Sequence, residues 1–410
     1  MFKLCRGRII FSMDIFGDLI KSFFSKKNNG ELTIKKFEDD FAQYIGSKHA
    51  VAVASGKMAL YLTLKALGAK EGDQIIIPAY TVSEVIDVII LCKLIPVFVD
   101  INLKDANIDV SLIEKRITPN TKFILMVHMF GCPCDIDEII AISKKYNLKV
   151  IEDGAQSCGA EYKGKKIGSF GDIGYFSFGI MKNLNTLGGG MIVAQNSDRI
   201  NFIRKQINKF SENLMGQLFK KTVLVFFVSI LTTPVIFSFV VYPLLFIIEE
   251  NRREKIFKSL FKARPVTAQC MEKLKVKFSP YQAAIGIAGL KKIEQINQKR
   301  INNAKVLNQA LNNIDGVSLI KESSDSKNIY LNYVIRINNR QKLINRMFNK
   351  GIDVSAGFIE CCPDLARFEL YQCDCPRSRI WEKENLYLPV YHPLKREVMI
   401  KISKLIKEAL

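Results

Sequence analysis

The amino-acid sequence predicts an α/β fold, with a large, mostly parallel sheet covered by helices on both faces and a smaller α+β domain after it. Two observations support this prediction. Residues 33–200 alternate between short apolar segments and segments with helical periodicity, which is the pattern of consecutive β-α units. At 410 residues, 48% of them hydrophobic, the chain is also long enough for two or three domains with sizeable cores.

The individual elements follow in chain order. Apolar stretches predict strands at 49–54, 74–77, 95–100, 123–128 and 148–152. Helical spacing predicts helices at 37–45, 57–67 and 136–146 between them. Farther along, we expect one long helix from Phe278 toward Leu311, followed by a strand at 329–337 and helices at 341–349 and 395–409 in the small domain.

Polar and glycine residues follow three of the expected strands. They are Ser55-Gly56, the segment Pro78 to Thr81, and Asp153. Because parallel strands end at the same edge of a sheet, and ligands gather at that edge, we expect these residues to surround a binding site.

Lys182 and Asp153 together predict the chemistry of that site. Asp153 ends a strand, and Lys182 lies farther along in a glycine-flanked loop. A lysine amine can form a Schiff base with pyridoxal phosphate (PLP), while a carboxylate keeps the pyridine nitrogen of that cofactor protonated. The bland interpretations are a solvated lysine and a helix-capping aspartate.

Ser55, Gly56 and Lys57 open an expected helix directly after a strand. The backbone N–H groups and the dipole at such a helix start suit a dianionic phosphate. The alternative is an ordinary N-cap turn without a ligand.

Residues 222–248 form a run of 27 residues without a charged side chain. The run is long enough to cross a bilayer, but the segments on both sides look like parts of one fold. Basic residues flank both ends, and Pro234 near the middle can break a helix. We therefore expect a re-entrant or monotopic helical hairpin in the inner leaflet, with the active site on the cytoplasmic side of the inner membrane; the alternative is a buried or dimer-interface hairpin.

We expect four parts in the chain: an N-terminal amphipathic arm (1–30), a large domain (31–209), the hydrophobic insert (210–264), and an interface helix with the small domain (265–410). The arm is expected because apolar residues recur at helical spacing from Ile9 to Phe23. This helix could pack on the protein or lie on a membrane surface.

The formal charge of +20 requires anionic partners or surfaces. Nucleic acid, an anionic membrane and an anionic substrate are the candidates, and the sequence contains no nucleic-acid-binding motif, so we expect no nucleic acid partner. The ten cysteines lack zinc-ligand spacing, which predicts no metal site and favours reduced thiols in a cytosolic enzyme.

With these residues in view, the chain resembles the DegT/DnrJ/EryC1/StrS family of PLP-dependent sugar aminotransferases over about residues 35–205 and 270–408. The segments that carry the resemblance are Ala54–Leu60, Gly72–Thr81, Ile151–Gln156, Gly168–Asp172, Phe176–Phe178 with Lys182-Asn183, Ser279–Ala284 and Leu388–Val390.

The resemblance implies the PLP-dependent transferase fold of type I, as in aspartate aminotransferase, and a role for each site residue. Lys182 would bind the cofactor and move protons, Asp153 would pair with the pyridine nitrogen, and Gln156 would lie beside the phenolic oxygen. Gly56, Lys57 and Ser177 would bind the phosphate. Lys277 would reach the site of a neighbouring subunit, which implies a homodimer with shared active sites.

The resemblance also implies transfer of an amino group from L-glutamate to a nucleotide-activated keto-sugar, for surface polysaccharide or glycoconjugate biosynthesis. Two alternatives are the same reaction on a lipid-linked sugar and a non-catalytic scaffold in a membrane polysaccharide-assembly complex. The chain departs from the family pattern at Val82, Gly179, Gly188 and Lys275, where the family often has a bulky residue, a histidine, a glutamate and an asparagine.

Overall fold

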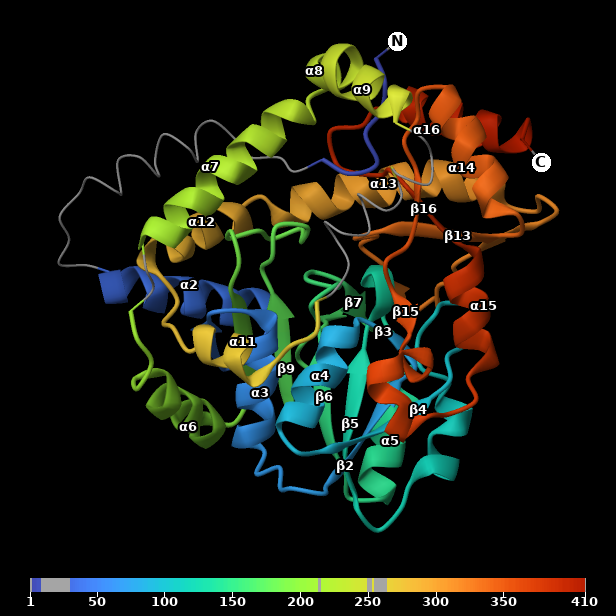
Figure 1. The fold of residues 1–410 in the computed structure, drawn as a ribbon. Helices are drawn as coiled ribbons and strands as arrows, with labels where there is room; N and C mark the ends of the chain where they lie inside the picture. The colour runs from blue at the N-terminus through green and yellow to red at the C-terminus, as the bar shows by residue number, and fades with distance from the viewer. Residues whose placement is uncertain (1, 9–29, 213–214, 249–252, 254–263, 410) are drawn as a thin grey trace.

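A computed structural model describes residues 2–8, 30–212, 215–248, 253 and 264–409, and a seven-stranded sheet forms the centre of its large domain (Figure 1). Six strands run in parallel, and β10 alone runs against both of its neighbours. In spatial order the strands are β1 (His49–Val53), β10 (Gly190–Ala194), β9 (Ile173–Ser177), β6 (Lys149–Asp153), β5 (Thr121–Val127), β2 (Gln74–Pro78) and β4 (Ile95–Val99). The predicted mostly parallel sheet is confirmed.

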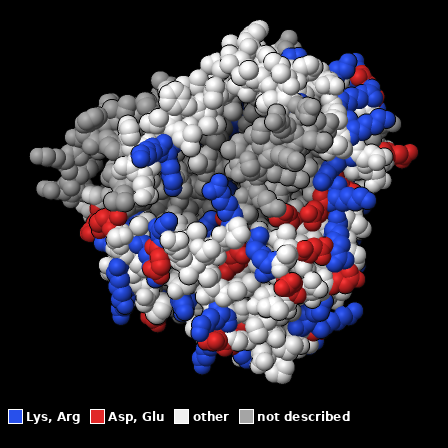
Figure 2. Space-filling model, viewed as in Figure 1, with Lys and Arg blue, Asp and Glu red and all other residues white. Residues whose placement is uncertain are grey.

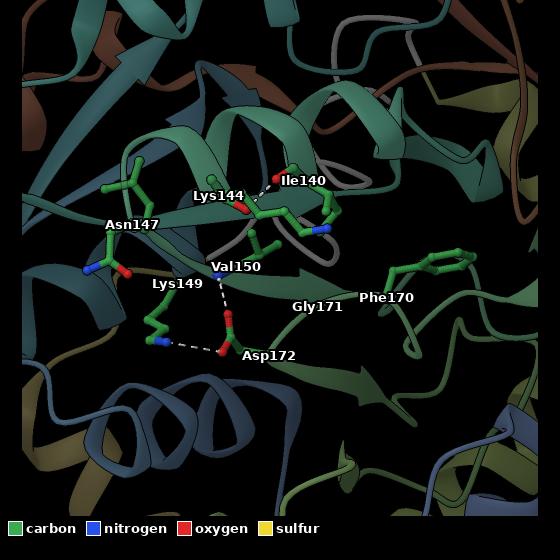
Figure 3. Close-up of a pocket in the computed structure, with 10 residues that line it drawn as sticks. Ile140, Lys144, Asn147, Lys149, Val150, Phe170, Gly171 and Asp172 are labelled. Atoms are coloured by element: carbon green, nitrogen blue, oxygen red, sulfur yellow. Dashed lines mark hydrogen bonds and ion pairs between the residues drawn. The ribbon is translucent and has the colours of Figure 1, made fainter.

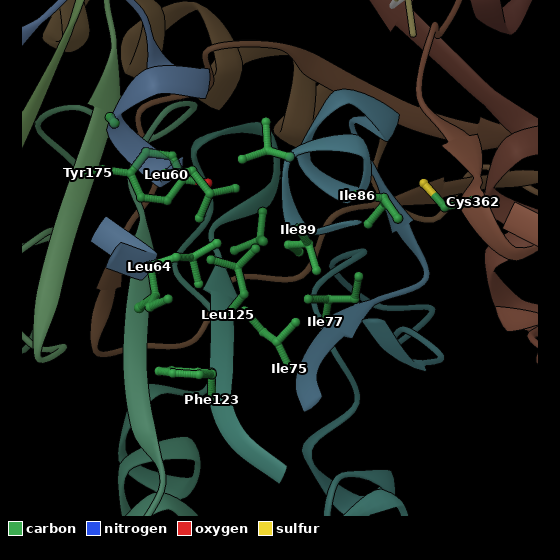
Figure 4. Packing of buried hydrophobic residues seen from close by; sticks show 14 of the residues in the cluster. Leu60, Leu64, Ile75, Ile77, Ile86, Ile89, Phe123, Leu125, Tyr175 and Cys362 are labelled. Carbon is green, nitrogen blue, oxygen red and sulfur yellow. The ribbon is translucent and has the colours of Figure 1, made fainter. Parts of the chain in front are cut away.

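The two faces of the sheet bury alternate residues of each strand, as the pleat requires. Ile75 and Ile77 point to one face, where α3 (Gly56–Ala66), α4 (Ser83–Leu91) and α6 (Ser197–Ile207) pack (Figure 4). Ile76 points to the other face, which α5 (Ile136–Lys145) and α2 (Gly30–Ile45) cover. Because both faces are covered, the strands are nearly continuous apolar runs.

The C-terminal small domain is built on a four-stranded antiparallel sheet with the order β11 (Val317–Leu319), β13 (Tyr333–Ile337), β16 (Asn385–Leu388), β14 (Ser355–Ala356). Its core joins Ile335 and Leu386 of the sheet to Met347 of α14 (Arg340–Asn349) and Ile402 of α16 (Arg396–Lys407). The remaining short elements are β3 (Tyr80–Thr81), β7 (Glu161–Tyr162), β8 (Lys165–Lys166), α11 (Ala268–Lys273), β12 (Ser326–Lys327), β15 (Glu360–Cys361) and α15 (Pro376–Glu384).

The prediction of a single long helix from Phe278 toward Leu311 is wrong in one respect. The segment forms two helices, α12 (Pro280–Leu290) and α13 (Ile293–Leu311). Between them Lys292 leaves helical geometry, with φ −106° and ψ −9°. The break lets α12 stay against the large domain while α13 packs on α16 of the small domain.

Over residues 215–248, the described core of the hydrophobic insert is a bent pair of helices. This part consists of α7 (Met215–Leu231), the short α8 (Pro234–Ile236), a π-helical turn (Phe237–Val241) and α9 (Tyr242–Ile247). The break falls just before Pro234, as the proline predicts, but the two arms meet with a bend of only 64°. Within the described part of the chain, no single helix is long and apolar enough to cross a membrane, and this bent pair passes that test only jointly.

The first residues of the chain lie along the small domain. Leu4 bridges to Ile352, and the Arg6 guanidinium donates to both carboxylate oxygens of Asp353, at 2.6 and 2.8 Å. The amphipathic helix expected from Ile9 to Phe23 lies outside the described residues. All ten cysteine thiols are free.

A tight contact between α2 and α12 gives a test of this packing. A Cβ at Gly286 would lie 2.4 Å from the buried Phe37 ring, so Gly286→Ala should lower the free energy of unfolding by roughly 1–3 kcal/mol through overpacking. Gly216→Ala in α7 meets open space and should cost nothing. Chemical denaturation of both variants measures this, and equal stabilities would contradict the close α2–α12 contact.

Candidate active site

The residues predicted to bind a ligand lie at one edge of the large sheet. Strands β1, β2, β6 and β9 are parallel, so their carboxyl ends share that edge. Ser55 follows β1, Asp153 ends β6, and Ser177 ends β9. The structure therefore brings together groups that are far apart in the sequence, as the strand-end argument predicts.

Lys182 lies in the loop from Gly179 to Gly190, which connects the adjacent strands β9 and β10. The loop is closed at its base, where the Phe178 amide donates to the Gly189 carbonyl at 2.9 Å. The Gln282 amide of α12 donates to the carbonyls of Thr186 and Gly188, each at 3.1 Å. These bonds fix the position of the loop, and with it the position of the lysine.

Asn183, directly after Lys182, anchors the other side of this loop. Its side-chain amide donates to the Cys158 carbonyl at 2.7 Å and to the Asn297 side chain of α13 at 2.9 Å. The lysine is therefore held between fixed neighbours, which limits the space that its side chain can sample.

Burial lowers the pKa of Lys182, while the negative charges of Asp153 and Glu84 raise it by less. A lowered pKa increases the fraction of uncharged amine at neutral pH, and the uncharged amine is the form that attacks a carbonyl carbon. The environment of Lys182 thus suits a nucleophile.

Asp153 is the acid that faces this lysine. Its Oδ2 accepts a hydrogen bond from the Tyr175 hydroxyl at 2.5 Å, and its Oδ1 accepts one from the Ala155 amide at 2.8 Å. Burial raises the pKa of Asp153, and these two bonds, together with Lys182, oppose that rise. A buried carboxylate with fixed donors is suited to hold a protonated ring nitrogen.

Tyr175 is a site residue that the sequence did not reveal. It lies opposite Asp153 in the register of β6 and β9, and its side chain is buried in the core on that face of the sheet. The only signal in the sequence is that a tyrosine occupies an apolar strand position, where a buried hydroxyl needs a partner.

Gly56 and Ser177 form a cradle that a larger residue would fill. A Cβ at Gly56 would lie 2.9 Å from the Ser177 Cβ and 3.2 Å from its hydroxyl oxygen. Ser55 is extended, with φ −168°, and its hydroxyl accepts a bond from the Met58 amide at 3.1 Å. The Ser177 hydroxyl therefore lies close to the start of α3, which is the arrangement that binds a phosphate group.

Lys57 lies at the same helix start, but its ammonium group pairs with Glu84 of α4 at 2.6 Å. Glu84 is the second residue that the sequence argument missed. The segment from Pro78 to Thr81, shortly before Glu84, was expected at the site, but nothing in the sequence paired Glu84 with Lys57.

The remaining two predicted residues have other partners. The Gln156 side chain is buried, and its Oε1 accepts a bond from the Phe130 amide at 3.2 Å. Lys277 pairs with Glu212 at 2.7 Å in an exposed segment. No contact of Lys277 with Lys182, Asp153 or Ser177 is found within the described single chain.

A hollow of about 370 Å³ on the surface is not this site (Figure 3). It is lined by Lys149 and Val150 at the start of β6 and by Asp172 before β9. It therefore lies at the opposite edge of the sheet from Asp153. Among the residues that the structure describes, no group of three His, Cys, Asp or Glu side chains is arranged to hold a metal ion.

The groups at this site match those that PLP requires. The cradle of Gly56 and Ser177 matches a phosphate group, Asp153 matches a ring nitrogen, and the Lys182 amine matches an aldehyde carbon.

Removing the charge of Glu84 tests the role of Lys57. Glu84→Gln frees the ammonium group and removes a negative charge near the cradle, so the Kd for PLP should fall roughly three- to tenfold. Lys57→Met should raise it. Fluorescence titration measures both, with Glu71→Gln, which breaks a distant exposed pair, as control. Weaker binding by Glu84→Gln would contradict the assignment.

Removing the Tyr175 hydroxyl tests whether its hydrogen bond lowers the pKa of Asp153. Tyr175→Phe deletes a donor to the charged carboxylate, so the pKa of Asp153 rises further and the acidic limb of cofactor binding moves to higher pH, by about one unit. The absorbance of the lysine-bound cofactor is followed across pH, with Tyr162→Phe as control. An unmoved limb would show that Tyr175 has no influence on Asp153.

Comparison with known proteins agrees with this site. The sequence model described as the DegT/DnrJ/EryC1/StrS aminotransferase family matches residues 21–222 and 255–407. An uncharacterized protein of Methanocaldococcus jannaschii is 31% identical over 385 residues, covering 91% of this chain and 89% of that protein. A GDP-perosamine synthase of Caulobacter vibrioides is 43% identical over 165 residues, which span 40% of this chain and 44% of that enzyme.

Solved structures share the fold. An aminotransferase from Psychrobacter cryohalolentis superposes with a TM-score of 0.78 at 23% identity, covering 100% of this chain and 98% of that one. The sugar aminotransferase CalS13 from Micromonospora echinospora gives 0.77 at 19% identity, with 99% and 100% coverage. From the family match over most of its length, the chain belongs to the DegT/DnrJ/EryC1/StrS family of PLP-dependent aminotransferases.

Proposed function

We propose that this protein transfers an amino group from L-glutamate to the keto group of a nucleotide-activated sugar, for a surface polysaccharide or glycoconjugate. The observation that carries the proposal is the pairing of the half-buried Lys182 with the buried Asp153, at the same sheet edge as the cradle of Gly56 and Ser177. Relatives named GDP-perosamine synthase and UDP-N-acetyl-3-dehydro-alpha-D-glucosamine 3-aminotransferase support the substrate class, although each match spans less than half of the relative.

Each of the predicted site residues has a separate role in this reaction. PLP, when bound, supplies an electron sink for the carbon that gains or loses the amino group. Lys182 would hold the cofactor and would then move a proton at that carbon as a general acid and base. Asp153 would keep the ring nitrogen protonated, and Gln156 would contribute a polar side chain to the cofactor site. Gly56, Lys57 and Ser177 would bind the phosphate and fix its orientation.

We further propose a homodimer with shared active sites. Lys277 supports this, because it is only half-buried and its ammonium group pairs with Glu212, not with a described site residue of its own chain. In a dimer it would reach the phosphate region of the neighbouring site. Light scattering that gives a mass of one chain, 46.6 kDa, at working concentrations would rule the dimer out.

We place the enzyme on the cytoplasmic side of the inner membrane, with the insert against the inner leaflet. The uncharged run from 222 to 248 and the basic residues on both of its sides support this placement. The insert also packs beside the loop of Lys182, through Leu218 and Val225 against Leu187. That position favours a second candidate substrate, a lipid-linked keto-sugar.

A transamination assay tests the function. Purified protein with PLP should show the absorbance of a lysine-bound cofactor, and L-glutamate should bleach it. UDP-, GDP- and dTDP-linked keto-sugars, with a lipid-linked keto-sugar in parallel, should restore it. Lys182→Ala should lower turnover at least a thousandfold, as expected for loss of the nucleophile, while Lys93→Ala, an exposed control, should leave turnover unchanged. Wild-type protein that forms no such absorbance would refute the proposal.

A further inference from the structure

We propose that the insert is a docking surface for an anionic lipid bilayer, entering one leaflet and not crossing it. We call this surface the apolar ridge and define it as residues 219–247 of α7, α8, the π-helical turn and α9. The inference deepens the membrane placement in the proposed function by naming the residues that contact lipid.

The first part of the ridge is one face of α7. On the inner face Leu218, Thr222 and Val225 are buried against α12, where the Thr222 hydroxyl lies 3.0 Å from that of Tyr281. On the outer face Leu224 and Phe227 are 59% and 57% exposed. An exposed helix face of a water-soluble protein is normally polar, so the outer face of α7 is built for an apolar partner.

The second part of the ridge follows the bend. Tyr242 turns inward, and its hydroxyl donates to the Phe348 carbonyl of the small domain at 2.5 Å. Phe239 and Ile247, in contrast, are 72% and 80% exposed. The full set of large apolar residues exposed along the ridge is Phe219, Leu224, Phe227, Leu231, Val235, Phe239, Val240, Leu244, Phe246 and Ile247.

The described surface over α8 is white in Figure 2, without the red or blue of charged side chains. The charges stand at the two ends instead. Lys220 and Lys221 precede the run in α7, and Arg253 and Arg264 follow it in the described residues. An apolar strip with basic ends matches the order of acyl chains and anionic headgroups at a leaflet surface.

Charge also decides between a bilayer and a second copy of the chain. A two-fold contact through the ridge is self-complementary and brings the basic ends of one copy near those of the other, which is repulsive. Anionic headgroups neutralise the same charges. The bend of 64° and the lack of a single spanning helix in the described chain agree with insertion into one leaflet.

The inner side of α7 links this surface to the active site. Leu187, in the loop of Lys182, is buried with Leu218 and Val225, and a Cβ at Gly188 would lie 3.6 Å from the Lys221 ammonium group. A bilayer on the outer side of α7 would therefore lie one helix away from the catalytic loop.

Vesicle flotation tests the inference. Full-length protein is mixed with phosphatidylglycerol–phosphatidylethanolamine vesicles or with phosphatidylcholine vesicles and centrifuged through a density gradient. We expect the protein to float with the anionic vesicles and less with phosphatidylcholine, and high salt to reduce the difference. The triple variant Phe227→Gln, Phe239→Gln, Ile247→Gln should float at least tenfold less.

The control replaces exposed apolar residues that lie away from the ridge, Ile95→Gln with Leu370→Gln, and should float like the wild type. Wild-type protein that stays at the bottom with every vesicle would overturn the inference. So would a triple variant whose mass by light scattering falls to a smaller oligomer, because a second copy would then cover the ridge. Flotation needs no catalysis, so a protein that floats but transfers no amino group contradicts the proposed function alone.

Discussion

The pairing of the half-buried Lys182 with the buried carboxyl group of Asp153 is the constraint on which the rest of the site depends. Neither group is stable in an apolar interior alone, because burial favours the neutral form of each. The Tyr175 hydroxyl and the Ala155 amide stabilise the carboxylate, and the closed loop holds the lysine at its side. The sheet is what makes this arrangement possible, since adjacent parallel strands bring their ends to one edge.

Much of the fold could be predicted because its signals are local. Apolar strand runs, helical spacing and the serine-glycine turn before α3 depend on neighbouring residues in the chain. The structure confirms most of these predicted elements within a few residues, but α2 begins at Gly30 and not at Phe37 as expected. The break between α12 and α13 could not be seen, because the polar residues Lys291 and Lys292 are compatible with helix. Tertiary packing on two different domains decides it.

The sequence could predict those site residues whose side chains have a chemical role of their own. Lys182, Asp153 and Gly56 stood out by type and spacing, while Ser177 was implied by the family resemblance. The structure brings their elements to one edge. Tyr175 and Glu84 act through partners on other elements, and register across strands cannot be read from one sequence. Pro234 predicts where the helix of the insert breaks. The angle between the two arms, a bend of 64°, could not be predicted from the sequence.

Because α7 packs on Leu187, the insert is part of the packing around the active-site loop. Leu187 has a φ of 64°, which is strained for a residue with a side chain, and it is buried between α7 and α12. A shortened protein without the insert, attractive because it would be easier to handle, would remove the α7 side of this packing from a leucine that is followed by three glycines. Its loop would be free to relax, and measurements on it would describe a different enzyme.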